Sequence, residues 1–108
     1  MMSKELMQAW IAALESGKYK QGHFSLNKGG CHCALGVLVE VSPDHEFAPG
    51  NEEGHLYCRS KQTTEFADCY VDTDLLDPEE QSYVVEWNDG EELSFKGIAS
   101  RLRERYLS

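Results

Sequence analysis

The spacing of hydrophobic residues predicts a helix near the start of the chain. Apolar residues recur there at intervals of three and four, as they do on the buried face of a helix. They are Leu6, Met7, Trp10, Ile11 and Leu14. Ser3 is a good N-cap for this helix, and Gly17 is a good C-terminal stop.

A second helix is predicted from residue 78 onward. In the sequence D-P-E-E at residues 77–80, the proline stands at the first helical position, where its missing N–H costs nothing. The flanking Asp77 and Glu80 are placed to form a capping box. The apolar stripe of this helix consists of Tyr83, Val84 and Trp87. The sequence N-D-G at 88–90 is expected to end it.

The last predicted helix begins after Ser94, which is again a good N-cap. Its apolar residues fall on one face and are Phe95, Ile98, Ala99, Leu102 and Tyr106. Because only a few residues join this helix to the preceding one, the two are expected to pack as neighbours, antiparallel or crossed.

The middle of the chain contains several short strand signals. Residues 22–26 are typical of a strand that leads into a tight turn at 27–30. Residues 55–60 and 64–71 predict two further strands. Residues 43–54, which precede these two strands, combine two prolines, two glycines and four acids, and this composition predicts an exposed loop. An acidic connector is expected at 72–77.

Residues 33–41 fit two structures. The valines in this run favour a buried strand, whereas Leu35, Leu38 and Val41 recur at intervals typical of a helix. Periodicity in so short a run does not decide between a strand and a helix. Pro43 ends the element in either case.

These elements predict an α+β fold in a single domain spanning residues 1–108, with three or four helices packed on a small antiparallel sheet. The expected core consists of Trp10, Leu14, Phe24, Leu38, Val84, Phe95, Ile98 and Leu102.

Charge is distributed unevenly along this chain. Residues 1–39 and 93–108 carry net charges of +2 and +3, whereas residues 40–92 carry sixteen Asp and Glu against two basic residues, a net of −14. Such an acidic middle repels nucleic acid and anionic membranes and attracts basic surfaces.

Hydropathy and cysteine use bear on the compartment. The longest apolar run, around residues 35–39, is far shorter than the roughly 20 residues that span a bilayer. The N-terminal sequence also lacks the pattern of a secretory signal. We therefore expect a cytoplasmic protein without membrane association, in which the four cysteines are free thiols.

Three stretches of the sequence resemble a family of small proteins encoded in tailed-phage and prophage genomes. They are W-I-A-A-L-E-S-G-K-Y-K-Q-G at 10–22, C-A-L-G-V-L-V-E-V at 33–41 and N-D-G-E-E-L-S-F-K-G-I-A-S-R-L at 88–102. The resemblance implies a phage accessory protein that acts in the bacterial host cytoplasm, and it implies no particular activity. Ala34 and Val39 stand where the family pattern has cysteines, which argues against shared metal or redox chemistry.

A zinc-binding structural module is one alternative. Cys31, Cys33, His55 and Cys58 offer thiolate and imidazole ligands, but the C-x-x-C spacing of strong zinc motifs is missing. We expect no metal and no other cofactor. The cysteines and histidines also match no known local signature of a catalytic thiol, and the sequence has no phosphate-binding glycine loop. We therefore expect no catalytic residues.

A small DNA-binding regulator is a second alternative. The closing helix pair would then be a helix-turn-helix whose basic residues face the duplex: Lys96, Arg101, Arg103 and Arg105. The net charge of −9 and the acidic first helix of the pair oppose this reading. We expect no direct binding to nucleic acid.

The favoured hypothesis is a non-enzymatic phage accessory protein that binds and inhibits a host protein through its acidic middle. A basic groove on a nucleic-acid-handling defence system such as CRISPR would suit that charge. Alternatively, the acids form only a solvated face. The candidate contacts, all expected in loops, are Glu52, Glu53, Asp72, Asp74, Glu91 and Glu92.

Overall fold

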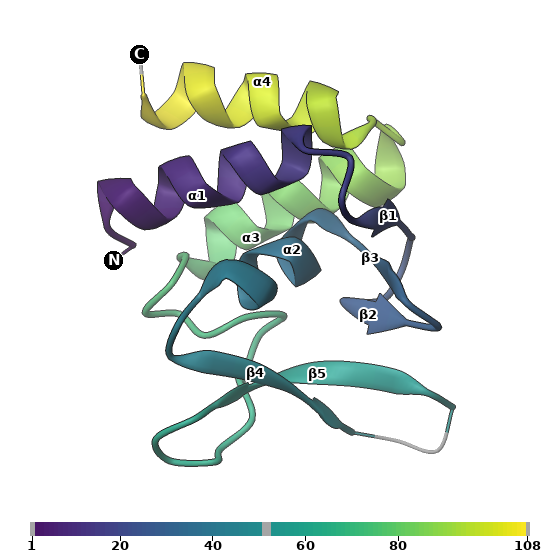
Figure 1. The fold of residues 1–108 in the computed structure, drawn as a ribbon, viewed down its shortest axis with the longest axis vertical. Helices are drawn as coiled ribbons and strands as arrows, with labels where there is room; N and C mark the ends of the chain where they lie inside the picture. The colour runs from purple at the N-terminus through teal and green to yellow at the C-terminus, as the bar shows by residue number, and fades with distance from the viewer. Residues whose placement is uncertain (1, 51–52, 108) are drawn as a thin grey trace.

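The computed structural model describes residues 2–50 and 53–107, which form four α-helices, one π-helical turn and five short strands (Figure 1). The helices are α1 (Lys4–Glu15), α2 (Ala34–Val41), α3 (Pro78–Val85) and α4 (Phe95–Tyr106), and the π-helical turn is η1 (Glu86–Gly90). The strands are β1 (Lys20–Gln21), β2 (Asn27–Lys28), β3 (Cys31–His32), β4 (His45–Pro49) and β5 (His55–Ser60).

The strands form one sheet in the order β1-β3-β2-β5-β4. Each neighbouring pair is antiparallel except β1 with β3. The longest pair is the β4–β5 hairpin, in which His45 lies opposite Ser60 and Pro49 lies opposite Leu56. The predicted α+β fold, a single domain of helices with a small and mainly antiparallel sheet, is confirmed.

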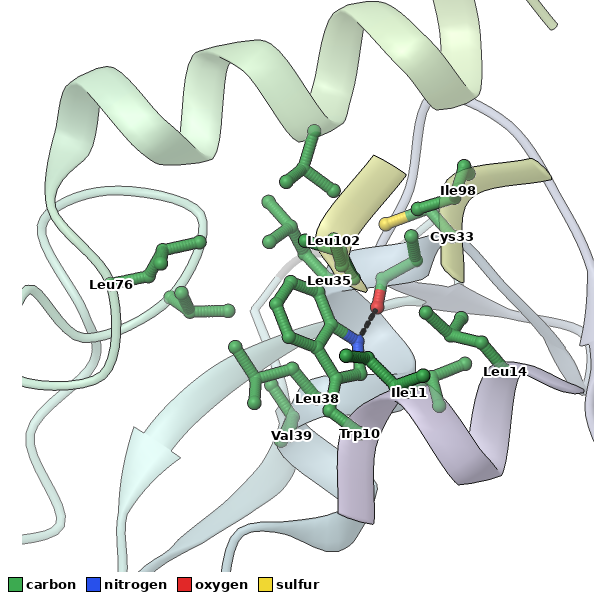
Figure 2. Close-up of a cluster of buried hydrophobic side chains, with 14 of the residues drawn as sticks. Trp10, Ile11, Leu14, Cys33, Leu35, Leu38, Val39, Leu76, Ile98 and Leu102 are labelled. Carbon is green, nitrogen blue, oxygen red and sulfur yellow. Dashed lines mark hydrogen bonds between the residues drawn. The ribbon is translucent and has the colours of Figure 1, made fainter. Parts of the chain in front are cut away.

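The core lies around Trp10, whose side chain is fully buried. The indole N–H donates a hydrogen bond of 2.8 Å to the carbonyl oxygen of Ala34, so the ring is buried without leaving its polar group unpaired (Figure 2). Helix α1 packs along α4 and against α2, and α2 in turn packs against α3 and β4 (Figure 1). The large side chains buried with Trp10 include Ile11, Leu14, Leu35, Leu38, Ile98 and Leu102.

Residues 34–41 form a helix with Cys33 as its N-cap, which answers the question that periodicity left open. Helix α2 is buried from Ala34 to Val39 on all its faces, as expected for an apolar helix inside a domain. A Cβ atom at Gly36 would overlap the carbonyl oxygen of Leu26. The helix therefore needs glycine at this position to approach the neighbouring chain.

Several strand predictions are wrong. Residues 22–26 bend between β1 and β2, and residues 43–54, expected as an exposed loop, contain β4. Residues 64–71 contribute only an isolated bridge, from Phe66 to Arg59. The turn predicted at 27–30 is shorter than expected and consists of Gly29 and Gly30, between β2 and β3. Both glycines have a positive φ, as a two-residue hairpin turn requires. Strand formation depends on partners that are distant in sequence, so local composition misplaced these strands.

The predicted helix caps are confirmed in part. The hydroxyls of Ser3 and Ser94 accept hydrogen bonds from backbone amides of the first turns of α1 and α4. Pro78 occupies the first turn of α3, as predicted. The capping box is wrong, because the Asp77 side chain makes no capping bond and Glu80 pairs with an arginine of α4.

Helix α3 ends at Val85 and continues directly as η1, whose last residue is Gly90, so the helical segment ends within the predicted N-D-G motif at 88–90. Helix α4 then packs mainly along α1 rather than on α3 (Figure 1). The two closing helices are therefore not the close pair that the short connection predicted.

Phe24 was expected in the core and is instead 81% exposed, whereas the other seven expected core residues are buried. A pair of substitutions tests this correction. Leu102→Ala should lower the free energy of unfolding by about 2–5 kcal/mol, because it leaves a cavity. Phe24→Ala should cost less than about 1 kcal/mol, as expected for an exposed site. Chemical denaturation measures both values, and equal losses would contradict this assignment of the core.

Candidate functional site

A cleft of about 970 Å³ opens beside the β4–β5 hairpin. Its lining comes largely from β5, the segment 66–70 and α3, and in Figure 1 the hairpin that contains β5 lies below α3. Buried side chains of Leu26, Cys33 and Cys58 contribute to its lining. Its volume is at the upper end of the range for pockets that bind small molecules, and an open cleft of this size also admits a peptide segment.

Exposed aromatic rings gather at this cleft. Among the described residues, five large aromatic side chains are exposed, and four of them line the cleft. These four are Phe24, Tyr57, Phe66 and Tyr70. The fifth, Tyr83, lies elsewhere, with the Arg105 guanidinium 4.7 Å from its ring centre. Contiguous exposed apolar surface of this kind is typical of a site that is covered by a ligand or partner.

The charged groups that line the cleft are acidic. They are Glu53, Asp68 and Asp89, and no lysine or arginine lines the cleft in the described part of the chain. Glu53 lies 3.7 Å from the ring of His55. The lining is therefore both aromatic and negative, which favours groups that are cationic and partly apolar.

A buried glutamine holds the segment after residue 70 against α3. The Gln81 side chain is 1% exposed and exchanges two hydrogen bonds of 3.0 Å with the backbone of Val71. Its amide also donates to the carbonyl oxygen of Leu76 at 2.7 Å. Three backbone groups are thus satisfied by one side chain, which fixes this wall of the cleft without regular secondary structure.

The opposite wall is fixed by the hairpin. His55 Nδ1 and Ser25 Oγ are 2.8 Å apart in a hydrogen bond that joins β5 to the segment before β2. A Cβ atom at Gly50 would overlap the ring of Tyr57. Glycine at this position therefore makes room for one of the cleft aromatics.

The side chain of Asn88, in η1, connects three separate parts of the chain. It is 1% exposed. Its oxygen accepts from the Gln21 side chain at 3.0 Å and from the Ala34 amide at 3.2 Å, and its nitrogen donates to the Gly22 carbonyl at 3.0 Å. Sequence reasoning took this residue only as a helix end. The N-D sequence at residues 88–89 was the only sequence feature that singled out Asn88. Its position in a π-helical turn adds a structural indication, because such turns are frequent at functional sites.

The neighbouring Asp89 holds Phe24. One carboxylate oxygen, Oδ1, accepts from the Phe24 amide at 3.1 Å and from the Asn88 side chain at 2.7 Å. Phe24 has a φ of 62°, a left-handed conformation that costs a residue with a side chain roughly 1–2 kcal/mol. The π-helical turn therefore holds the Phe24 backbone in a strained conformation, with the exposed ring at the edge of the cleft.

Two of the three thiols that line the cleft, Cys33 and Cys58, are poorly suited to nucleophilic chemistry. Burial raises the pKa of Cys33 to about 11, and burial also raises the pKa of Cys58. Both thiols are therefore protonated near neutral pH and are poor nucleophiles. Among the described residues, no group of three or more His, Cys, Asp or Glu is placed to hold a metal ion, so Cys31, Cys33, His55 and Cys58 do not converge as the zinc alternative requires.

The acidic residues singled out from the sequence do not form one surface. Glu53 lines the aromatic cleft, whereas Asp72 and Asp74 line a smaller, polar depression of about 370 Å³. The Glu91 carboxylate forms a bidentate pair with Arg101, with both N–O distances 3.1 Å, so a partner that contacts Glu91 has to compete with this arginine. Glu92 is exposed with a φ of 55°. Glu52 lies outside the described residues.

Asp72 takes part in a chain of side chains that sequence reasoning missed. Ser42 Oγ lies 2.8 Å from His45 Nδ1, and His45 Nε2 lies 3.2 Å from Asp72 Oδ2. The order Ser-His-Asp is that of a hydrolase triad. However, Ser42 is 4% exposed and stands at the C-terminal end of α2, where carbonyl groups rather than amides point outward. The chain of bonds therefore joins α2, β4 and the segment at residue 72 as a structural connection.

The three arginines of α4 are paired with carboxylates. Arg101 pairs with Glu91, Arg105 pairs with Glu80, and Arg103 forms a bidentate pair with Glu15 of α1. These groups would have to give up their partners in order to contact phosphates, which weighs against the DNA-reading alternative.

The fold and the cleft define a small α+β domain that presents an open aromatic site with an acidic lining. The family described as "Domain of unknown function (DUF8296)" matches residues 2–96, and the chain belongs to this family. No curated protein and no solved structure matches the chain. In the described residues, no helix has the length and apolar character needed to cross a bilayer.

The Asp72 interactions predict a pH dependence of stability. Hydrogen bonds from the Asp74 amide and from His45 hold the pKa of the Asp72 carboxyl below its usual value of 3.8, although burial opposes the shift. Because the pKa is lowered on folding, ionised Asp72 stabilises the fold above pH 3.8, and this contribution disappears as the pH falls through the folded-state pKa.

Thermal melts of Asp72→Asn measure this effect. The variant should melt below the parent protein at pH 7, and the difference should shrink as the pH falls below 3.8. Asp74→Asn is the matched control for the loss of one charge, because its carboxylate lies exposed beside Asp72. A constant difference across this pH range would contradict the prediction.

Proposed function

We propose that this domain is a non-enzymatic binding protein that holds a basic, apolar segment of another protein in its aromatic cleft. The observation that carries the proposal is the coincidence of four exposed aromatic rings with a lining whose charged groups are all acidic in the described residues. Of the acidic contacts expected from the sequence, this proposal keeps Glu53, because it lines the cleft.

Aromatic rings supply most of the binding energy in this proposal. Exposed rings such as Phe66 and Tyr70, 47% and 53% exposed, lose contact with water when a partner covers them. They lose little side-chain freedom in doing so, which is one reason that aromatic residues dominate the energetics of protein interfaces. The bridge from Phe66 to Arg59 of β5 and the hydrogen bonds from Gln81 to Val71 hold the segment that carries these two rings.

Electrostatics supply the selectivity. With a net charge of −14 over residues 40–92, the domain attracts basic partners and speeds their encounter with the cleft. Binding should weaken as salt is added, since charges at the edge of a cleft are screened over about 10 Å at 0.1 M salt. An acidic or neutral segment would lack this attraction.

The biological role that we propose is that of a phage accessory protein which inhibits a host protein. The resemblance of residues 10–22 and 88–102 to phage-encoded proteins supports it, as does the fit of an acidic cleft to a basic, nucleic-acid-handling surface such as that of a CRISPR effector. A partner held at such a surface would be kept from its nucleic acid.

A bacterially displayed library of random 12-residue peptides tests the binding proposal directly. The immobilised full chain should recover peptides enriched in Arg or Lys together with aromatic or aliphatic residues. Recovery of no peptides, or of peptides without a basic bias, would contradict it. A host protein captured from lysate supports the inhibitor role only if its own activity falls when the domain is added.

Variants of the cleft provide the matching prediction. Phe66→Ala and Tyr70→Ala should each weaken binding of a recovered peptide by about tenfold or more, because truncating an aromatic anchor costs about 1–2 kcal/mol or more. Their melting temperatures should change little, since both side chains are about half exposed. Tyr83→Ala is the control, because it removes an exposed ring that lies outside the cleft. Fluorescence anisotropy titrations measure the affinities.

A further inference from the structure

We propose that Phe24 and Asp89 form a subsite for an arginine side chain of the bound segment. This inference rests on the proposed function, because it names the group that one end of the cleft would recognise. Both residues line the cleft, and they are joined by the 3.1 Å hydrogen bond from the Phe24 amide to Asp89 Oδ1. The subsite thus combines an aromatic face with a carboxylate.

Phe24 has properties that folding alone does not explain. Its ring is 81% exposed, so it contributes little to the core, and its backbone has a φ of 62°. Two residues of η1 nevertheless hold this segment in place. The Asn88 side chain donates a hydrogen bond to the Gly22 carbonyl, and the Asp89 carboxylate accepts one from the Phe24 amide. A strained residue that is kept exposed by the surrounding structure is typical of a binding site.

Asp89 has one carboxylate oxygen committed and one available. Oδ1 accepts both hydrogen bonds, from Phe24 and from the Asn88 side chain. Within the described residues, Oδ2 has no hydrogen bond or ion pair. A planar guanidinium can donate to Oδ2 and lie over the Phe24 ring at the same time, which combines a charge-assisted hydrogen bond with a cation–π contact.

Arginine fits this subsite better than the other occupants do. Lysine offers a compact, strongly hydrated charge that does not stack on a ring in this way. A second copy of this chain would bring its own acidic cleft and a net charge of −9 toward the acidic lining, and like charges oppose that contact. The occupant is therefore an arginine within a basic, apolar segment of a different protein.

The test uses the tightest peptide recovered from the random library and a second version in which each Arg is replaced by Lys. The parent protein should bind the Arg version about tenfold more tightly. Asp89→Asn keeps an oxygen for the Phe24 amide but replaces Oδ2 with an amide donor, so the preference for Arg should disappear. Asp68→Asn removes the same charge from another part of the cleft and should leave that preference intact.

Two further variants separate the ring from the backbone strain. Phe24→Ala should weaken binding of the Arg peptide and leave the melting temperature nearly unchanged. Phe24→Gly should weaken binding equally while keeping or raising the melting temperature, because glycine adopts a positive φ without strain. A large fall in the melting temperature of Phe24→Gly would instead assign the ring a structural role and overturn the inference.

The remaining outcomes also distinguish the two proposals. If peptides bind and depend on Phe66 but not on Phe24 or Asp89, the subsite is wrong while the cleft proposal stands. Equal affinity for the Arg and Lys peptides overturns the subsite in the same way. If the library yields no peptide, both fail. If sedimentation shows a dimer that Phe24→Ala dissociates, the ring contacts a second copy and the arginine subsite is wrong.

Discussion

The buried side chain of Asn88 is the interaction on which much of this structure depends. It satisfies the first amide of α2, the carbonyl oxygen of Gly22 and the side chain of Gln21, and so fixes two segments, residues 21–22 and the start of α2, against η1. An unpaired buried amide costs about 1–3 kcal/mol, so the arrangement tolerates no simple replacement of asparagine. The next residue, Asp89, uses the same rigid turn to hold Phe24 at the edge of the cleft.

The cleft is formed where segments without regular secondary structure are hydrogen-bonded to α3 and to the β4–β5 hairpin. Gln81 binds the backbone of residues 71–76 to α3, and His55 binds the hairpin to Ser25. Both devices use buried or half-buried polar side chains in place of sheet or helix pairing. The walls of the site are therefore fixed, while their aromatic side chains stay exposed to a partner.

The electrostatics of the domain differ from the simple picture of an acidic surface. Several carboxylates are engaged within the fold, including Glu15, Glu80 and Glu91, each paired with an arginine of α4. These pairs neutralise the basic end of the chain and fasten α4 to its neighbours. The acids that remain at the cleft, such as Asp68 and Asp89, are fewer, but they lie beside aromatic rings, where a cation gains both charge and stacking contacts.

The sequence by itself determined three of the four α-helices in the described part of the chain, because helical periodicity and helix caps are local signals. The first and last helices, their caps and seven of the eight expected core residues were predictable for this reason. Tertiary structure decided the rest. The apolar run at 34–41 forms a helix that packs against α1, α3 and β4, and β4 pairs with β5. Phe24 is exposed, and its amide is held by Asp89, which is distant in sequence. An apolar residue in isolation signals burial, and only the packed chain shows which one is held out for a partner.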